Sequence, residues 1–211
     1  MKSLLLAAAS LLLVTGCTSR TSSVTDNGNS EGGSQNTNQN GSSSEAGNNS
    51  DTTDKKVLVV YYSATNHTKN VADTIASHLS ASTFELTPVN PYTSADLNYS
   101  NSNSRVVKEH NDPNRHTELT SVTSPDFASA DYIFLGAPVW WQQLSWVIND
   151  FVSENDFTGK TIIPFGTSAS SSFSVTNLKA LDDKGTWLTE KRFSSNVASK
   201  DVVSWVDSLS L

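Results

Sequence analysis

The chain has 211 residues, of which 14 are Lys or Arg and 21 are Asp or Glu, and it contains one cysteine. This length fits a single domain with appended segments. One cysteine excludes an intramolecular disulfide and a cysteine-based metal cluster. The acidic balance, without a cluster of arginines or lysines, argues against nucleic acid as a partner.

The first residues predict an export signal. Lys2 precedes an apolar run over residues 4–14 that is too short to span a bilayer, so we expect a signal peptide over residues 1–16. The Val-Thr-Gly before Cys17 resembles the lipobox of bacterial lipoproteins. That resemblance implies cleavage before Cys17 and attachment of a lipid to its thiol. The alternative is an ordinary secretory signal with an incidental cysteine.

Residues 17–54 consist almost wholly of Ser, Thr, Asn, Gly and Gln. A segment with so few apolar side chains cannot bury enough surface to offset its chain entropy, so we expect a disordered linker. With a lipid on Cys17, this linker would tether a domain of residues 55–211 to the outer face of the cell membrane, outside the cytoplasm. Long tethers of this kind are typical of Gram-positive lipoproteins.

Residues 55–211 alternate short apolar runs with amphipathic segments, the pattern of an α/β domain with a doubly wound parallel sheet. We expect strands over residues 56–62, 83–86, 131–136, 160–165 and 187–193. We expect helices from about Thr68 and over residues 104–110, 144–152, 175–181 and 200–209. Ser199 is predicted to cap the last helix, with Asp201 in its first turn.

The most informative stretch is Val57–Thr68, VLVVYYSATNHT, where an apolar strand runs into a loop of hydroxyl and amide side chains. The segment after it places Val71, Ile75 and Leu79 on one helical face. Free N–H groups at a helix start and the hydroxyls of Ser and Thr together bind phosphate. The loop therefore predicts a phosphate site, and the alternative is a helix cap alone.

Two further loops should lie beside the first, because ligands of doubly wound sheets bind beyond the carboxyl ends of the strands. Residues 137–143, APVWWQQ, present two tryptophans, and residues 166–173, GTSASSSF, offer uncharged hydrogen-bonding groups. A phosphate site beside an aromatic platform and a polar rim fits flavin mononucleotide (FMN). The other tryptophans, Trp146, Trp187 and Trp205, lie inside predicted elements, so we expect them in the core.

Residues 56–211 resemble the flavodoxin family, most closely its members with a Ser-Ala-Thr-Asn first loop and a Pro-x-Trp-Trp second loop. The residues that match the family's first-loop signature are Val59, Val60, Tyr61, Ser63, Thr68 and Ala72. The chain departs from it at Asn66, where a small residue is usual, although Asn tolerates a left-handed backbone. The resemblance implies a five-stranded parallel sheet in the order 2-1-3-4-5 with helices on both faces.

The resemblance also implies which residues bind FMN. Trp140 matches the position that stacks on the isoalloxazine ring, with Trp141 beside it. The expected FMN-binding residues are Ser63, Thr65, Asn66, His67 and Thr68 around the phosphate; Pro138, Val139, Trp140 and Trp141 beside the ring; Thr167, Ser168, Ala169 and Ser170 along its polar edge; and Phe173 over its other face.

Two features of the ring-side loops bear on redox behaviour. At the position of Trp141, flavodoxins often carry a glycine whose peptide turns over on reduction. A positive φ there would cost a bulky residue roughly 1–2 kcal/mol more than glycine, so we expect weaker stabilisation of one-electron-reduced flavin. Neither ring-side loop contains an acidic residue, so we expect a less negative reduction potential than in strongly acidic flavodoxins.

The sequence offers no catalytic acid, base or metal ligand set. His78, His110 and His116 lack ligand spacing and are expected to face solvent. No GxSxG elbow is present and no histidine follows position 116, which excludes an α/β-hydrolase triad. Three function classes stay open: an FMN electron carrier with a redox partner protein, an FMN-dependent reductase that passes electrons from NAD(P)H to quinones or other small acceptors, and a flavin-free binding module.

Overall fold

The computed structural model describes residues 55–169 and 171–211. The predicted signal peptide over residues 1–16, the predicted linker over residues 17–54 with Cys17, and Ser170 lie outside the described residues. Within the described part of the chain, no helix is both long enough and apolar enough to cross a bilayer.

A parallel sheet forms the centre of the domain, and its strands follow the order β2-β1-β3-β5-β6. These are the five predicted strands in the predicted order 2-1-3-4-5, so the expected fold class is confirmed. Off this path, β4 pairs antiparallel with β3, and β7 pairs parallel with β5. The strands are β1 (Val57–Tyr61), β2 (Ser82–Glu85), β3 (Tyr132–Trp140), β4 (Gln143–Leu144), β5 (Thr161–Thr167), β6 (Thr186–Trp187) and β7 (Lys191–Phe193).

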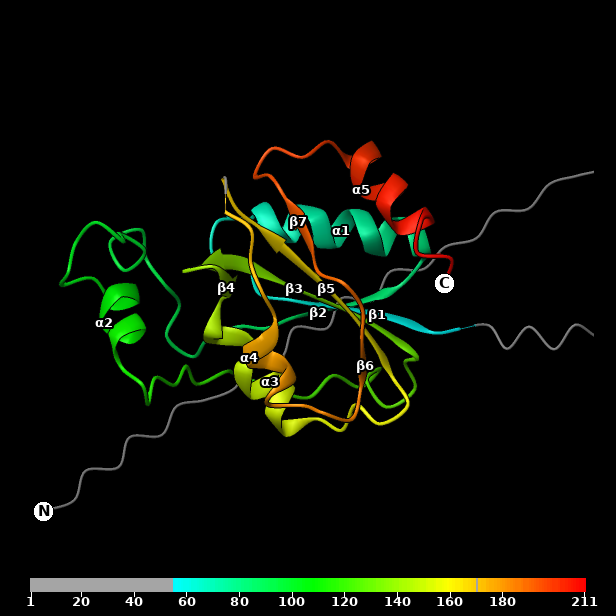
Figure 1. The fold of residues 1–211 in the computed structure, drawn as a ribbon, viewed down its shortest axis with the longest axis horizontal. Coiled ribbons are helices and arrows are strands. Elements are labelled where there is room, and N and C mark those ends of the chain that lie inside the picture. The colour runs from blue at the N-terminus through cyan, green and yellow to red at the C-terminus, as the bar shows by residue number, and fades with distance from the viewer. Residues whose placement is uncertain (1–54, 170) are drawn as a thin grey trace, which may run out of the picture. The chain divides into compact units, whose positions relative to one another are not determined.

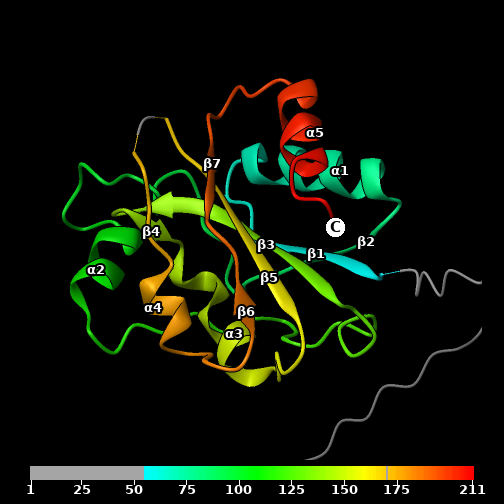
Figure 2. The same ribbon diagram turned by 45° about the vertical axis from the view of Figure 1, so that its right-hand side comes forward.

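Helices cover both faces of the sheet, as Figures 1 and 2 show. Helices α1 and α5 lie against one face, and η1, α3 and α4 lie against the other. Helix α2 stands to the side of the sheet, near β4 (Figure 1). The helices are α1 (His67–Leu79), α2 (Arg105–Asn111), the 3-10 helix η1 (Trp146–Ile148), α3 (Asn149–Glu154), α4 (Thr176–Lys179) and α5 (Ser199–Asp207).

The apolar run of β1 supplies a core on each side of the sheet. Val59 and Tyr61 belong to the core under α1 and α5, whereas Leu58 and Val60 belong to the opposite core. A strand buried on both faces needs apolar residues at every position, which explains why this stretch shows no alternation with polar residues. Burying each side chain of this size stabilises the fold by roughly 1.5–3 kcal/mol.

The predicted core tryptophans all contact a core. Trp146 is buried, at 3% exposure. Trp187 packs, partly buried, against the core under α3, and Trp205 against the core under α5.

The predicted strand over residues 187–193 is two short strands, β6 and β7. Between them, the ladder with β5 is interrupted opposite Ile163 and Pro164. Proline has no N–H to donate to a neighbouring strand, which accounts for an interruption at this point.

Two predicted helix starts are also corrected. Residues of the predicted helix 144–152 become helical only from Trp146, because Leu144 pairs with β3 as part of β4. Ser199 is the first residue of α5 rather than its cap, and Ala198 occupies the cap position without a side-chain hydrogen bond. Asp201 lies in the first turn of α5, as predicted.

Residues 87–130, which we call the β2–β3 connection, leave the sheet after β2, form α2 and return to the sheet at β3. The two arms of the connection are joined where the N–H of Val89 donates to the carbonyl of Glu118 at 2.9 Å. Its end is held by the buried Lys160, whose ammonium donates to the carbonyls of Ala128 and Ala130 at 3.1 and 2.8 Å. The connection thereby brings α2 to the edge of the sheet where the strands β1, β3 and β5 end.

Candidate functional site

The first loop, between β1 and α1, has the geometry of an anion site. The hydroxyl oxygen of Ser63 accepts from the backbone N–H of Lys69 at 3.1 Å, so the hydroxyl proton is left to donate elsewhere. Asn66 has a φ of 65°, the left-handed conformation that asparagine was expected to tolerate there. Helix α1 carries no acidic residue in its first turn. Its N-terminal N–H groups, which have no intrahelical acceptor, therefore meet no competing carboxylate.

A buried hydrogen bond ties this loop to the end of β5. The hydroxyls of Thr68 and Thr167 lie 2.7 Å apart, and both residues are at most 5% exposed. Thr167 in turn pairs with Pro138 of β3 across the parallel ladder. The first loop and the ends of β3 and β5 are thus held together. The Thr68 and Thr167 hydroxyls, both predicted to bind FMN, form a hydrogen bond with each other instead.

The segment 137–143, predicted as a loop, is instead a β-hairpin. Trp140 at the end of β3 pairs with Gln143 of β4, which leaves Trp141 and Gln142 as a two-residue turn. Their φ angles are 45° and 61°. Positive φ at both central residues is what a type I′ hairpin turn requires. Asn-Gly is the usual signal for this turn, so Trp-Gln gave no indication of it.

Trp141 was expected from the sequence to adopt a strained positive φ only on reduction of the flavin. The structure shows that positive φ already. A left-handed backbone costs a residue other than glycine about 1–2 kcal/mol. Antiparallel pairing on both sides of the turn enforces it, and the Trp141 indole also stacks on His110 of α2, with ring centroids 4.1 Å apart and an interplanar angle of 8°. The hairpin tip is therefore fixed from the strands and from the β2–β3 connection together.

A cavity of about 380 Å³ opens between the first loop, the hairpin and the β2–β3 connection. This volume lies within the usual range for small-molecule sites. Among the residues that the structure describes, no charged side chain lines it: the lining residues are Ala64, Thr65, Leu97, Tyr99, Val106, Pro138, Val139, Trp140 and Trp141. The cavity thus joins the predicted phosphate loop, through Thr65, to all four residues predicted beside the ring.

The described residues of the predicted polar edge, Thr167, Ser168 and Ala169, do not line this cavity. Ser168 donates its hydroxyl proton to the carbonyl of Ser171 at 2.7 Å, within its own loop, and Ala169 is exposed. Phe173 is only 8% exposed and lies in the core against Gly166. It does not line the cavity, so it does not occupy the predicted place over the other face of the ligand.

His67, predicted in the phosphate site, occupies the first position of α1. It lines a separate small hollow beside the β7–α5 loop, together with Ser195 and Val197. The structure therefore places it at the helix start but not among the residues that line the cavity with Trp140.

Trp140 is held in place by three aromatic rings. The rings of Tyr62, Tyr92 and Trp146 meet it at steep angles, with centroids 6.0, 5.2 and 4.9 Å away. Edge-to-face aromatic pairs contribute about 0.5–1.5 kcal/mol each beyond their burial. Burial and a hydrogen bond to Glu109 raise the pKa of Tyr92 to about 12, so this phenol stays neutral.

The expectation that all three histidines face solvent is wrong for His110. Its Nδ1 atom is buried without a hydrogen-bond partner among the described residues, and its ring stacks on Trp141, with the Trp146 centroid 6.4 Å away. Burial, together with the nearby Arg115 cation, lowers the pKa of His110. His78 and His116 are exposed.

Sequence reasoning missed the wall contributed by the β2–β3 connection: Leu97, Tyr99 and Val106. Tyr99 is 79% exposed although it borders the cavity. The available signal was that these apolar residues stand almost alone in a polar segment. Among the described residues, no group of three or more His, Cys, Asp or Glu converges as a metal site.

Comparison with known protein families gives a match to the flavodoxin family over residues 56–209. The chain belongs to the flavodoxin family. A comparison with curated proteins found no match.

Solved structures with the same fold include two candidate flavoproteins from Bacteroides. The one from Bacteroides eggerthii DSM 20697 is 34% identical with a TM-score of 0.66, over 74% of this chain and 98% of that one. The one from Bacteroides uniformis ATCC 8492 is 32% identical with a TM-score of 0.67, over 72% and 98% of the two chains. A flavoprotein from Lactobacillus acidophilus NCFM in complex with FMN is 21% identical with a TM-score of 0.55, over 74% and 99%.

The hairpin of this flavodoxin yields a stability prediction. Gln142→Gly should stabilise the protein by about 0.5–1 kcal/mol, because glycine adopts the positive φ of this position without strain and is the residue that a type I′ turn prefers there. Urea denaturation measures the change. Gln143→Gly, in β4, is the matched control and should destabilise the protein; a destabilising Gln142→Gly would contradict the strained turn.

His110, which is partly buried, yields a pH prediction. Because the pKa of His110 is lowered in the folded state, the unfolded chain binds more protons below about pH 6.5, and stability falls as the pH drops through that range. His110→Phe keeps an aromatic ring against Trp141 but cannot be protonated. Urea midpoints between pH 7.5 and 5.5 should therefore fall less for His110→Phe than for the unaltered protein, and an equal fall would refute this assignment.

Proposed function

We propose that this flavodoxin binds FMN, with the phosphate at the N-terminus of α1 and the isoalloxazine ring against Trp140. The observation that carries the proposal is the single cavity that joins Thr65 of the first loop to Trp140 of the hairpin. The phosphate needs donors without a carboxylate nearby, which the start of α1 and the Ser63 hydroxyl supply. The related fold of the Lactobacillus acidophilus NCFM flavoprotein is one that holds FMN.

The lining fits the parts of FMN in separate regions. The uncharged wall suits the neutral ring, and the two phosphate charges fall at the positive end of α1. Bound FMN would supply reversible electron transfer. The chain would bind and orient it, because the lining holds no carboxylate, histidine or lysine that could act as an acid or base.

The role that follows is an electron carrier on the outer face of the membrane, which would use bound FMN to pass electrons between membrane and extracytoplasmic redox partner proteins. The lipobox pattern at Cys17 and the composition of residues 17–54 support the tether. The alternative is an FMN-dependent reductase of small electron acceptors, supported by the exposed Tyr99 beside the cavity, which would leave a small molecule access to the ring. Steady oxidation of NAD(P)H by the FMN-loaded protein would select the reductase.

FMN binding is tested by titrating the protein with FMN and with riboflavin while following tryptophan and flavin fluorescence. FMN should quench both signals with a dissociation constant in the micromolar range or below. Riboflavin, which lacks the phosphate, should bind at least 100-fold more weakly, because hydrogen bonds to a charged group contribute about 1.5–3 kcal/mol each. No quenching by either flavin would overturn the proposal and leave a flavin-free binding module.

Two variants distinguish the contribution of the phosphate loop from that of Trp140 in the same titration. Thr65→Val should weaken FMN binding about tenfold and leave riboflavin binding unchanged, whereas Trp140→Leu should weaken both flavins by a similar factor. Thr120→Val is the control, because Thr120 is exposed and does not line the cavity.

The tether is tested at Cys17. Metabolic labelling with radioactive palmitate should mark the unaltered protein and leave Cys17→Ser unlabelled, because the thiol carries the lipid. Equal labelling of the two proteins, or no labelling of either in a host that labels its own lipoproteins, would rule out a lipid anchor at this residue.

A further inference from the structure

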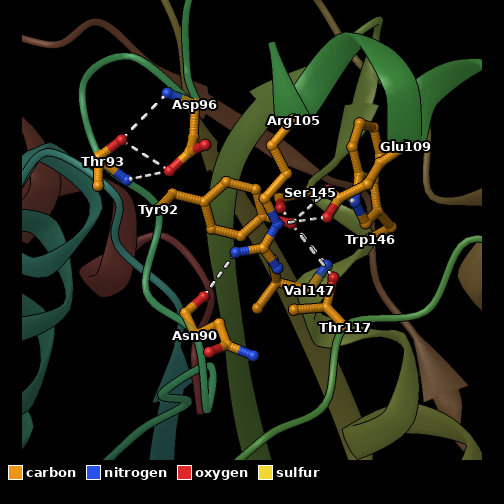
Figure 3. A network of polar contacts seen from close by, with 10 residues as sticks. All are labelled: Asn90, Tyr92, Thr93, Asp96, Arg105, Glu109, Thr117, Ser145, Trp146 and Val147. Carbon is orange, nitrogen blue, oxygen red and sulfur yellow. Dashed lines mark hydrogen bonds and ion pairs between the residues drawn. The ribbon is translucent and has the colours of Figure 1, made fainter. Parts of the chain in front are cut away.

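A partly buried network of polar contacts lies beneath α2, behind the cavity wall (Figure 3). Glu109 is at its centre. The carboxylate accepts hydrogen bonds from Arg105 Nε at 2.6 Å, from the Tyr92 hydroxyl at 2.5 Å and from Trp146 Nε1 at 3.0 Å. Because the Tyr92 proton is given to Glu109, the Thr117 hydroxyl at 3.2 Å donates to the Tyr92 oxygen.

Arg105 and Glu109 form an ion pair that is largely withdrawn from water. Their side chains are 26% and 15% exposed. The guanidinium also donates to the carbonyl of Asn90 at 2.6 Å and lies over the ring of Tyr92, 3.9 Å from its centroid. Both charges are therefore fixed in position, unlike the members of an exposed i, i+4 pair.

This pair lies close to the proposed ring position. Tyr92, on which Arg105 stacks, is 5.2 Å from Trp140 between ring centroids. Val106, next to Arg105 in the chain, lines the cavity directly. The guanidinium is thus separated from the Trp140 ring by two steps of 3.9 and 5.2 Å, within about one Debye length of 10 Å at 0.1 M salt. Aromatic rings fill that path, so its screening by ions is weak.

We propose that the Arg105–Glu109 pair tunes the reduction potential of bound FMN. This inference rests on the proposed FMN binding. Two-electron reduction of FMN with uptake of one proton, by dithionite in a titration, adds one negative charge to the ring. A cation behind the wall favours that charge and an anion opposes it. The intact pair presents both a cation and an anion, and no charged side chain of the described part of the chain lines the cavity to outweigh either.

Removing one charge at a time should shift the potential in opposite directions. Glu109→Gln keeps the side-chain shape and an acceptor for Tyr92 and Trp146, and it leaves Arg105 unpaired, so the FMN potential should rise. Arg105→Met leaves the Glu109 carboxylate unpaired, so the potential should fall at pH 8. We expect each change to alter the ratio of dissociation constants for oxidised and reduced FMN about tenfold, which is about 30 mV for a two-electron couple.

The double variant and two controls distinguish charge from packing. Arg105→Met with Glu109→Gln restores neutrality and should return the potential close to that of the unaltered protein. Arg105→Lys keeps the cation and should preserve the potential. Lys108→Met removes a cation of the same helix at an exposed position, where water screens it, and should cause no shift.

Redox titrations of the FMN-loaded proteins decide the matter, after fluorescence titration has shown that each binds FMN. Opposite shifts that cancel in the double variant support the proposal. Shifts of the same sign, or none larger than threefold in the ratio of dissociation constants, overturn it while leaving FMN binding intact. Absence of FMN binding to the unaltered protein would instead overturn the proposed function, and this proposal with it.

Discussion

The site depends on the register of three parallel strands, because Tyr61 of β1, Gly136 of β3 and Phe165 of β5 lie side by side across the sheet. This register requires glycine at position 136, where a Cβ atom would come within 2.1 Å of the Phe165 ring. Strand β1 ends at this row and β5 ends just beyond it at Thr167, whereas β3 continues to Trp140 in the hairpin. The first loop and the hairpin therefore lie next to each other, and the Thr68–Thr167 hydrogen bond ties the first loop to the end of β5, which pairs with the hairpin strand β3.

The fold and the first loop could be predicted from the sequence because they depend on local patterns. Continuous apolar strands, helical periodicity after Thr68 and the hydroxyl-rich loop are all read along the chain. The hairpin was missed because its register depends on pairing with β4, while Trp141 and Gln142 carry none of the usual turn residues. Contacts that depend on distant segments, such as Phe173 against Gly166, left no local signal.

The position of charged groups near the cavity could likewise not be predicted from local sequence patterns. The two ring-side loops contain no acidic residue, but charged residues elsewhere in the chain can still act on the cavity. Arg105 and Glu109 read in the sequence as an ordinary surface pair on one turn of a helix, which contributes little to stability. Only the fold of the β2–β3 connection shows that they face Tyr92 and Trp146 instead of water.

A buried ion pair is weak evidence for stability, because the loss of solvation offsets much of the attraction. Helix α2, with seven residues, is also too short to be stable by itself and depends on its tertiary contacts. The network at Glu109 supplies those contacts, and the stack of His110 on Trp141 adds another. The interactions that order α2 are thus the ones that place two opposite charges behind Trp140. The stability of α2 and the electric field at the cavity therefore depend on the same residues. A substitution that breaks the network would change both the stability of α2 and the field.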